Sequence, residues 1–79
     1  MIYRIESLQD WQKTTEALRK AQGTSVQQTA ELAGMTNPTL YKLLTSENAN
    51  PTLKTLLKVG QCLGYSLMIT QSPTYYEKQ

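Results

Sequence analysis

Apolar residues recur at helical spacing along most of the chain, in four segments separated by polar turns. Each segment follows a serine or threonine that can serve as an N-cap, and three of the segments end before a glycine. The pattern predicts helices over residues 8–22, 26–33, 37–44 and 53–63. The expected N-caps are Ser7, Ser25, Thr36 and Thr52, and the expected C-terminal glycines are Gly23, Gly34 and Gly64.

Two further segments, residues 1–5 (MIYRI) and 65–70 (YSLMIT), are short, apolar and partly β-branched, which predicts strands at both ends of the helical region. In the last helix we expect one apolar side, formed by Leu53, Leu56, Leu57 and Leu63 with Gly60 among them. The expected fold class is mainly α, with four (or five) helices and short N- and C-terminal β-strands. We expect one domain over residues 1–71 and a flexible tail over residues 72–79.

The composition excludes several classes of function. Histidine is absent and Cys62 is the only cysteine, so the usual zinc sites, histidine-based catalysis and an intrachain disulfide are excluded. A lone cysteine also fits the reducing cytoplasm. No apolar run approaches the roughly 20 residues that span a bilayer. We therefore expect a cytoplasmic binding protein that is not an enzyme, needs no metal or cofactor and has no membrane partner.

The net charge of +2 is concentrated in the middle third of the chain. Residues 36–58 carry Lys42, Lys54 and Lys58 against Glu47, whereas the charges of the segments on either side cancel. Three lysines on their own favour the alternative of a solvated helix surface. The charge supports nucleic-acid binding only if it coincides with an element that reads a groove.

Residues 26–45 (VQQTAELAGMTNPTLYKLLT) have the local features of a helix-turn-helix. Ala30 supplies a small residue where a second helix can cross the first, and Gly34 follows four positions later, where the turn needs a positive φ. The expected core of this unit is formed by Ala30, Gly34, Met35, Leu40 and Leu43. Thr29 departs from the pattern, because an aliphatic residue is usual before the alanine. A plain helical hairpin is the alternative.

In a helix-turn-helix the second helix lies in the major groove, and its first residues reach base edges. The positions expected to contact bases are Thr36, Asn37, Pro38, Thr39, Tyr41 and Lys42. Asn37 can pair with adenine, Lys42 can reach a guanine edge or a phosphate, and Thr39 can touch a thymine methyl or a phosphate. Tyr41 can contact a sugar or a phosphate, or it can be half-buried. The positions expected to contact phosphates are Ser25, Gln27, Thr45, Asn48 and Lys54.

Two pieces, TAELAGMTNPTLYKLL and NPTLKTLLKVGQCLGYSL, resemble the Xre/Cro–repressor helix-turn-helix family, with a likeness that covers residues 25–67. The whole outline is similar to antitoxins of the HipB and HigA types. The resemblance implies a lambda-repressor-like fold and a homodimer with paired terminal strands, which binds a palindromic double-stranded DNA operator and also holds a cognate toxin protein. Val26 stands where glutamine is usual, and the tail ends in TYYEKQ rather than in tryptophan, so Tyr75 and Tyr76 have no assigned role.

The size of the chain independently favours a dimer. A domain of 79 residues buries only about 60% of its unfolded surface, and bare strand edges favour pairing with another chain. The expected dimer interface contains Leu67, Met68 and Ile69. An intrachain ladder between residues 1–5 and 66–70 is the alternative.

Three functions agree with these features. The first is an operator-binding repressor of transcription that is also an antitoxin, and the second is a stand-alone phage-type regulator without a toxin. The third is a protein-interaction module that does not bind DNA. The third predicts an acidic or bulky apolar recognition face, and Asn37, Thr39 and Lys42 argue against it. We expect the first.

Overall fold

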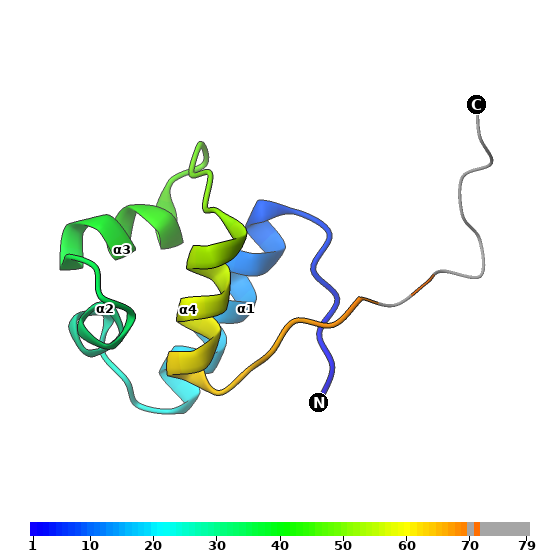
Figure 1. Cartoon of the computed structure of the whole chain (residues 1–79), viewed down its shortest axis with the longest axis horizontal. Coiled ribbons are helices and arrows are strands. Elements are labelled where there is room, and N and C mark those ends of the chain that lie inside the picture. Colours follow the sequence, from blue (N-terminus) through cyan, green and yellow to red (C-terminus); the bar gives the residue numbers. More distant parts are fainter. Residues whose placement is uncertain (70, 72–79) are drawn as a thin grey trace.

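The computed structural model describes residues 1–69 and residue 71, and this part of the chain contains four α-helices (Figure 1). They are α1 (Leu8–Ala21), α2 (Val26–Ala33), α3 (Asn37–Thr45) and α4 (Leu53–Leu63). The four helices predicted from the apolar pattern are therefore confirmed, and their ends agree within a residue. Thr70 and the expected tail over residues 72–79 lie outside the described residues.

Short-range capping bonds determine where the helices begin and end. The expected N-cap side chains accept hydrogen bonds from the backbone N–H three positions later: Ser7 from Asp10, Ser25 from Gln28, Thr36 from Thr39, and Thr52 from Thr55. Helices α1, α2 and α4 are followed by Gly23, Gly34 and Gly64, whose φ angles are 70°, 73° and 79°. A positive φ lets the next N–H reach back into the helix, which satisfies a carbonyl of the last turn.

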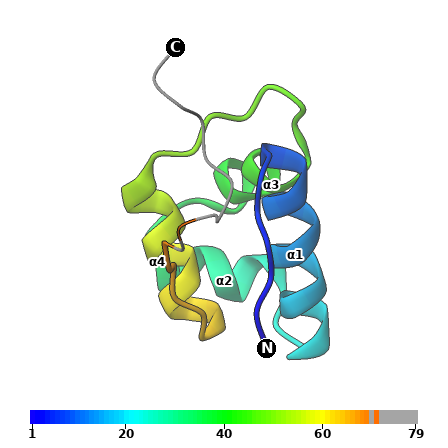
Figure 2. The ribbon, with the colours of Figure 1, turned by 90° about the vertical axis from the view of Figure 1, so that its right-hand side faces the viewer.

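The helices enclose one small core. Helix α1 packs on α3 and α4, and α2 packs on the same two helices. The core side chains are Trp11, Ala30, Leu40, Leu44, Val59 and Leu63, none more than 6% exposed. Figure 1 shows α2 and α3 at one end of the molecule, whereas residues 1–6 and 65–69 lie at the other. Seen from that other end, residues 1–6 pass in front of α1 and residues 65–69 pass in front of α4 (Figure 2).

Polar side chains of α1 and of Gln22, the residue that caps its C-terminal end, bond to elements that are distant in sequence. The indole Nε1 of Trp11 donates to the phenolic oxygen of Tyr65 at 3.0 Å. Gln22 Nε2 donates to the carbonyl of Leu63, the last residue of α4, at 2.6 Å. Both bonds attach the end of α4, and the segment that follows it, to α1.

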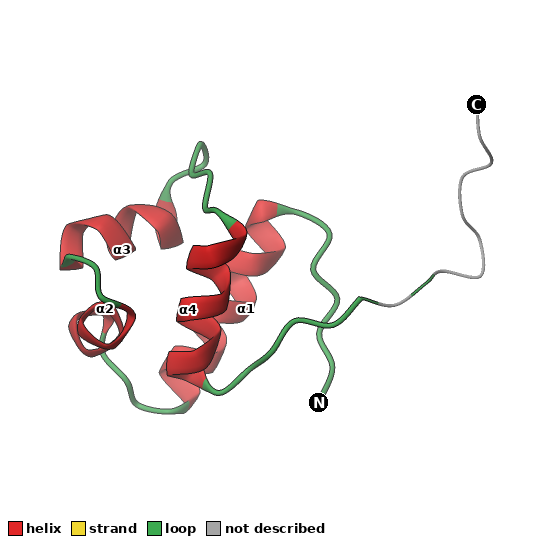
Figure 3. Ribbon diagram, in the orientation of Figure 1, coloured by secondary structure: helices red, strands yellow, loops and turns green. Residues whose placement is uncertain are grey.

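The predicted terminal strands are not formed in residues 1–5 and 65–69, the part of both segments that the structure describes. Residues 1–5 and 65–69 are irregular (Figure 3), and no backbone hydrogen bond joins one of these segments to the other. A strand needs a hydrogen-bonded neighbour, and here Ile5 and Leu67 instead line a common groove. The alternative of an intrachain ladder is therefore wrong for the described residues.

The expected apolar side of α4 is only partly buried. Leu63 is buried and Leu56 packs against the core, but Leu53 is 63% exposed and Leu57 is 46% exposed. The buried side of the helix runs through Val59 and Gly60 instead. Apolar spacing alone places Leu53 and Leu57 beside the buried side of α4. The packing of the other helices then shows that no described part of the chain covers these two leucines.

Candidate nucleic-acid interface

The turn between α2 and α3 is built by Gly34 and by two backbone bonds. With Gly34 in the left-handed region, its N–H donates to the Glu31 carbonyl at 3.2 Å, and the N–H of Met35 donates to the Ala30 carbonyl at 3.0 Å. This pair of bonds is a Schellman motif, which ends α2 and redirects the chain within three residues. The expected role of Gly34 in the turn is confirmed.

One side of the helix-turn-helix contributes to the core. Ala30 and Leu40 are fully buried, as expected, and Met35 and Leu43 pack against the core while remaining partly exposed. Gly34 itself is exposed in the turn. Leu44, which the expected list omits, is 6% exposed and belongs to the core.

The structure explains the polar residue that precedes Ala30. Thr29 is 1% exposed, and its hydroxyl donates to the carbonyl of Ser25 at 3.0 Å. A buried hydroxyl is tolerated when it has such a partner. The hydroxyl of Thr29 is therefore satisfied by a carbonyl of the same helix region. The sequence alone gave no reason for a polar residue at this position.

The opposite side of α3 is open to solvent. All six residues expected to contact bases are exposed: Thr36, Asn37, Pro38, Thr39, Tyr41 and Lys42. The alternative of a half-buried Tyr41 is wrong, because this side chain is 60% exposed. Because Leu40 and Leu44 fix the inner side of the helix, this outer side, which we call the recognition face, is held in one orientation.

Several residues of the recognition face have free polar groups, among them Asn37 and Lys42. Among the described residues, no hydrogen bond to the Asn37 amide is present, and no carboxylate lies within 4.0 Å of the Lys42 ammonium. Thr36 and Thr39 differ, because the Thr36 hydroxyl donates to Thr39 Oγ1 at 2.7 Å. Asn37 and Lys42 can therefore bind a new partner without first breaking an internal bond.

The five residues expected to contact phosphates are also exposed, and two of them have structural roles as well. Ser25 and Gln28 form a complete capping box, in which each side chain bonds the other residue's backbone N–H. The Thr45 hydroxyl donates to the Tyr41 carbonyl at 2.8 Å. Gln27 and Asn48 make no side-chain hydrogen bond to a described residue, and Lys54 makes no ion pair there.

The distribution of ion pairs separates the middle of the chain from its N-terminal third. The two ion pairs among the described residues are Arg4 with Glu6 and Arg19 with Glu16. The hydrogen bonds from the Arg19 guanidinium lower the pKa of Glu16, and they raise the pKa of Arg19. The excess lysines of residues 36–58 have no such partner among the described residues and stay available to an external anion.

One residue that positions the recognition helix is not apparent from the sequence. Gln12 on α1 donates through Nε2 to the carbonyls of Leu43, at 2.9 Å, and Ser46, at 2.8 Å. These carbonyls lie at the C-terminal end of α3, where helical partners are missing. Gln12 thus attaches the end of the recognition helix to α1, across 31 positions of sequence.

The comparisons with known proteins agree with this geometry. A family model described as helix-turn-helix matches residues 16–69, which is more than half of the chain. A search of curated proteins gives no significant match. No described helix has the length and apolar character needed to cross a membrane, and no described group of three or more Cys, Asp or Glu side chains is placed to hold a metal ion. The chain belongs to the Xre/Cro-like family of helix-turn-helix domains, whose members are DNA-binding regulators.

Proposed function

We propose that this protein is a cytoplasmic repressor that binds a specific double-stranded DNA operator through α3. The observation that carries the proposal is the exposure of the recognition face. All of its expected base-contacting residues are exposed, and the Asn37 amide is free among the described residues. The side-chain amide of asparagine can donate through Nδ2 to N7 of adenine while its Oδ1 accepts from the N6 amino group, and this pair of bonds distinguishes adenine in the major groove. Lys42, one and a half turns later, supplies a cation for a guanine edge or a phosphate.

Contacts to phosphates orient the protein on the duplex. Ser25 and Gln27 lie at the start of α2, where free backbone N–H groups suit an anionic oxygen. Thr45 and Asn48 lie at the end of α3 and in the following loop, and Lys54 lies in the first turn of α4. These contacts carry no sequence information, so we expect them to contribute equally to binding of all duplexes.

We further propose that the protein binds its operator as a homodimer. Nine of the eleven large apolar residues that are exposed in the described chain lie in the two terminal segments or on α4. Leu67, Met68 and Ile69 are among them. Residues 1–5 and 66–69 also lack backbone hydrogen-bond partners among the described residues. Pairing these segments with those of a second copy would satisfy their backbone groups and cover apolar surface.

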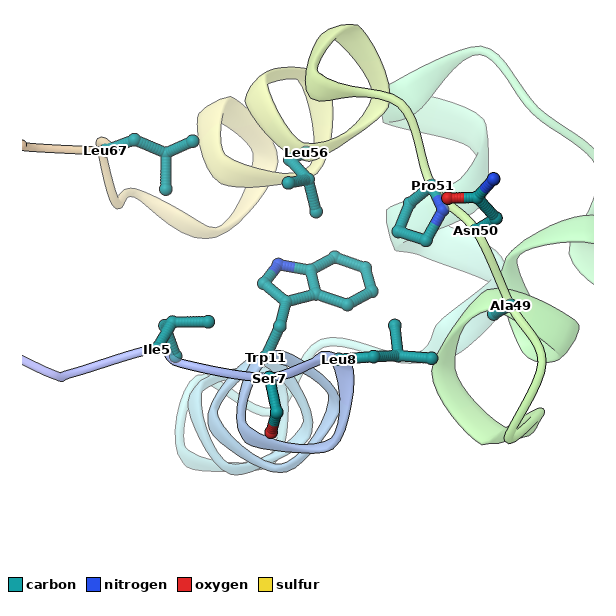
Figure 4. A pocket seen from close by; sticks show the side chains of 9 residues that line it. All are labelled: Ile5, Ser7, Leu8, Trp11, Ala49, Asn50, Pro51, Leu56 and Leu67. Carbon is teal, nitrogen blue, oxygen red and sulfur yellow. The ribbon is translucent and has the colours of Figure 1, made fainter. Parts of the chain in front are cut away.

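An open groove lies within the same surface. Its volume is about 290 Å³, and Figure 4 shows the Trp11 indole at its centre, with Ile5, Leu8, Leu56, Pro51 and Leu67 around it. The terminal segments lie away from α2 and α3 (Figure 1), so a dimer that pairs these segments would leave both recognition faces uncovered. Two such faces about one DNA turn apart, roughly 34 Å, would match a palindromic operator.

The antitoxin role is part of the proposal and is supported by the resemblance of residues 25–67 to antitoxins of toxin–antitoxin operons. Co-expression with the product of the adjoining reading frame tests it. A stable complex with a kinase-like or ribonuclease-like neighbour would support the role, whereas a chain that represses without any such neighbour would be a stand-alone regulator.

Selection from a random duplex library tests the DNA-binding proposal. We expect enrichment of a palindromic sequence, and a loss of about 1–3 kcal/mol at one or two positions for Asn37→Ala. Lys54→Ala should weaken binding to all duplexes alike and reduce the salt dependence. Lys13→Ala, which removes an exposed lysine of α1, is the matched control. A protein that enriches no sequence would contradict the proposal.

A further inference from the structure

Many hydrogen-bonding groups in the first turn of α3 are paired with other groups of the same turn. The Oγ1 of Thr36 accepts from the Thr39 N–H at 3.3 Å, and the Thr36 hydroxyl donates to Thr39 Oγ1 at 2.7 Å. The N–H of Leu40 bonds the Thr36 carbonyl at 3.1 Å, and Pro38 has no N–H. Hydrogen-bonding groups that are already paired contribute little to reading the edge of a base, because their internal bonds would have to be exchanged.

In three residues of this turn, the side-chain groups that make no internal bond are largely apolar, although the Thr39 hydroxyl, which accepts from Thr36, can still donate its own hydrogen. Thr36, Pro38 and Thr39 are all exposed, and they carry two γ-methyl groups and a pyrrolidine ring. Asn37 is the exception, because its amide is free among the described residues. The same turn therefore combines a free polar side chain, that of Asn37, with an apolar cluster made by Thr36, Pro38 and Thr39.

The major groove offers this cluster one matching feature. The four base pairs present donors, acceptors and a single kind of apolar group, which is the 5-methyl of thymine. We infer that Pro38 and Thr39 read thymine by contacting its 5-methyl group, within the half-site in which Asn37 reads adenine. This inference rests on the proposed function and decides between the two contacts, methyl and phosphate, that the sequence allowed for Thr39.

Replacing thymine by deoxyuridine tests the inference, because it removes only the methyl group. The probe is the duplex enriched by selection, compared with the same duplex in which every thymine is replaced by deoxyuridine. Burial of one methyl changes affinity by roughly three- to fivefold. We therefore expect the wild-type protein to bind the thymine duplex at least about threefold more tightly than the deoxyuridine duplex.

Two substitutions assign this preference to the residues named. Thr39→Ser removes a methyl but keeps the hydroxyl that accepts from Thr36, and Pro38→Ala removes the ring while keeping a residue that favours helix. We expect both variants to bind the deoxyuridine duplex as the wild type does and to lose most of the preference for thymine. Thr52→Ser removes the same methyl from an exposed threonine at the start of α4, outside the proposed contacts, keeps the capping hydroxyl and should keep the full preference.

The possible outcomes distinguish a failure of the inference from a failure of the proposed function. A wild-type protein that binds its selected duplex specifically but does not distinguish thymine from deoxyuridine refutes the inference alone. A preference that survives intact in both Thr39→Ser and Pro38→Ala also refutes it, since the methyl would then be read elsewhere. A protein that selects no duplex at all refutes the inference together with the proposed function.

Discussion

Tyr65 lies directly against Gly60, one turn before the end of α4. A Cβ atom at position 60 would be 2.8 Å from Cε1 of the Tyr65 ring and 2.9 Å from the Tyr65 carbonyl oxygen. The N–H of Tyr65 also donates to the Gly60 carbonyl at 2.9 Å, so the two backbones are fixed together. The close approach requires a residue without a side chain at position 60.

Gly60→Ala should therefore destabilise the domain, although alanine normally favours a helix. Relief of glycine's flexibility would stabilise α4 by roughly 0.5–1 kcal/mol. Overpacking against the Tyr65 ring and backbone costs about 1–3 kcal/mol, so we expect a net loss in the free energy of unfolding. Urea denaturation followed by circular dichroism measures this loss.

The neighbouring Gln61→Ala provides the control for that measurement, because Gln61 is exposed in the same turn of α4. We expect it to change stability by less than about 0.5 kcal/mol. If Gly60→Ala were as stable as Gln61→Ala, the contact with Tyr65 would not constrain this helix.

Gln12 should affect DNA binding although it lies on α1. Gln12→Ala leaves the carbonyls of Leu43 and Ser46 without their donor and frees the C-terminal end of α3. We expect a loss of about 1–3 kcal/mol in stability, together with about tenfold weaker binding to the selected duplex, because the recognition face loses its fixed orientation. Isothermal titration below the unfolding temperature measures the affinity.

Gln22→Ala is the matched substitution for this test. Gln22 donates in the same way to the last carbonyl of α4 but makes no hydrogen bond to α3. Its loss should lower stability by a similar amount and leave the affinity of the folded protein unchanged. Equal losses of affinity in both variants would show that Gln12 acts through general stability only.

The sequence predicted the features that depend on near neighbours. The four N-caps and three terminal glycines were correct because each capping bond joins residues only three to five positions apart. The turn at Gly34 was predictable for the same reason, and so was the exposed outer side of α3. Residue type and spacing are sufficient for these features because the chain between the partners is short.

Features that depend on distant partners were not predictable. The bonds of Trp11 with Tyr65 and of Gln12 with Leu43 join residues 54 and 31 positions apart, and no local pattern indicates them. The exposure of Leu53 and Leu57 on α4 was not predictable, because apolar spacing does not show which side of the helix the other helices cover. The terminal strands were predicted from composition, but composition cannot supply the neighbouring strand that they need.

Two buried threonines should respond in opposite ways to the same substitution. Thr15 and Thr29 are each 1% exposed, but the Thr29 hydroxyl bonds the Ser25 carbonyl, whereas the Thr15 hydroxyl has no partner among the described residues. Thr15→Val should raise the free energy of unfolding by about 1 kcal/mol, because it removes an unpaired buried hydroxyl. Thr29→Val should lower it by about 1 kcal/mol, because it removes a hydrogen bond. Thermal unfolding of both variants beside the wild type checks the signs, and a stabilising Thr29→Val would contradict the assigned bond.

The ion pair of α1 should make stability depend on acidity. Arg19 Nε and Nη2 donate to the two carboxylate oxygens of Glu16 at 2.8 and 2.9 Å, and these bonds lower the pKa of Glu16. Because the folded state then binds the proton less tightly than the unfolded state, the stabilisation is present above the unfolded pKa of about 4.3 and is lost as the pH falls through the folded pKa.

Glu16→Gln isolates this contribution from those of the other carboxylates. We expect the wild type to exceed Glu16→Gln in stability at pH 7 by less than about 1 kcal/mol, because the pair is partly exposed, and the difference should shrink as the pH falls below about 4. Glu31→Gln, which removes an exposed carboxylate without an ion pair among the described residues, should follow the wild type in denaturant titrations across this range. A wild-type advantage that stays constant down to pH 2 would show that Glu16 stabilises α1 through packing and not through its charge.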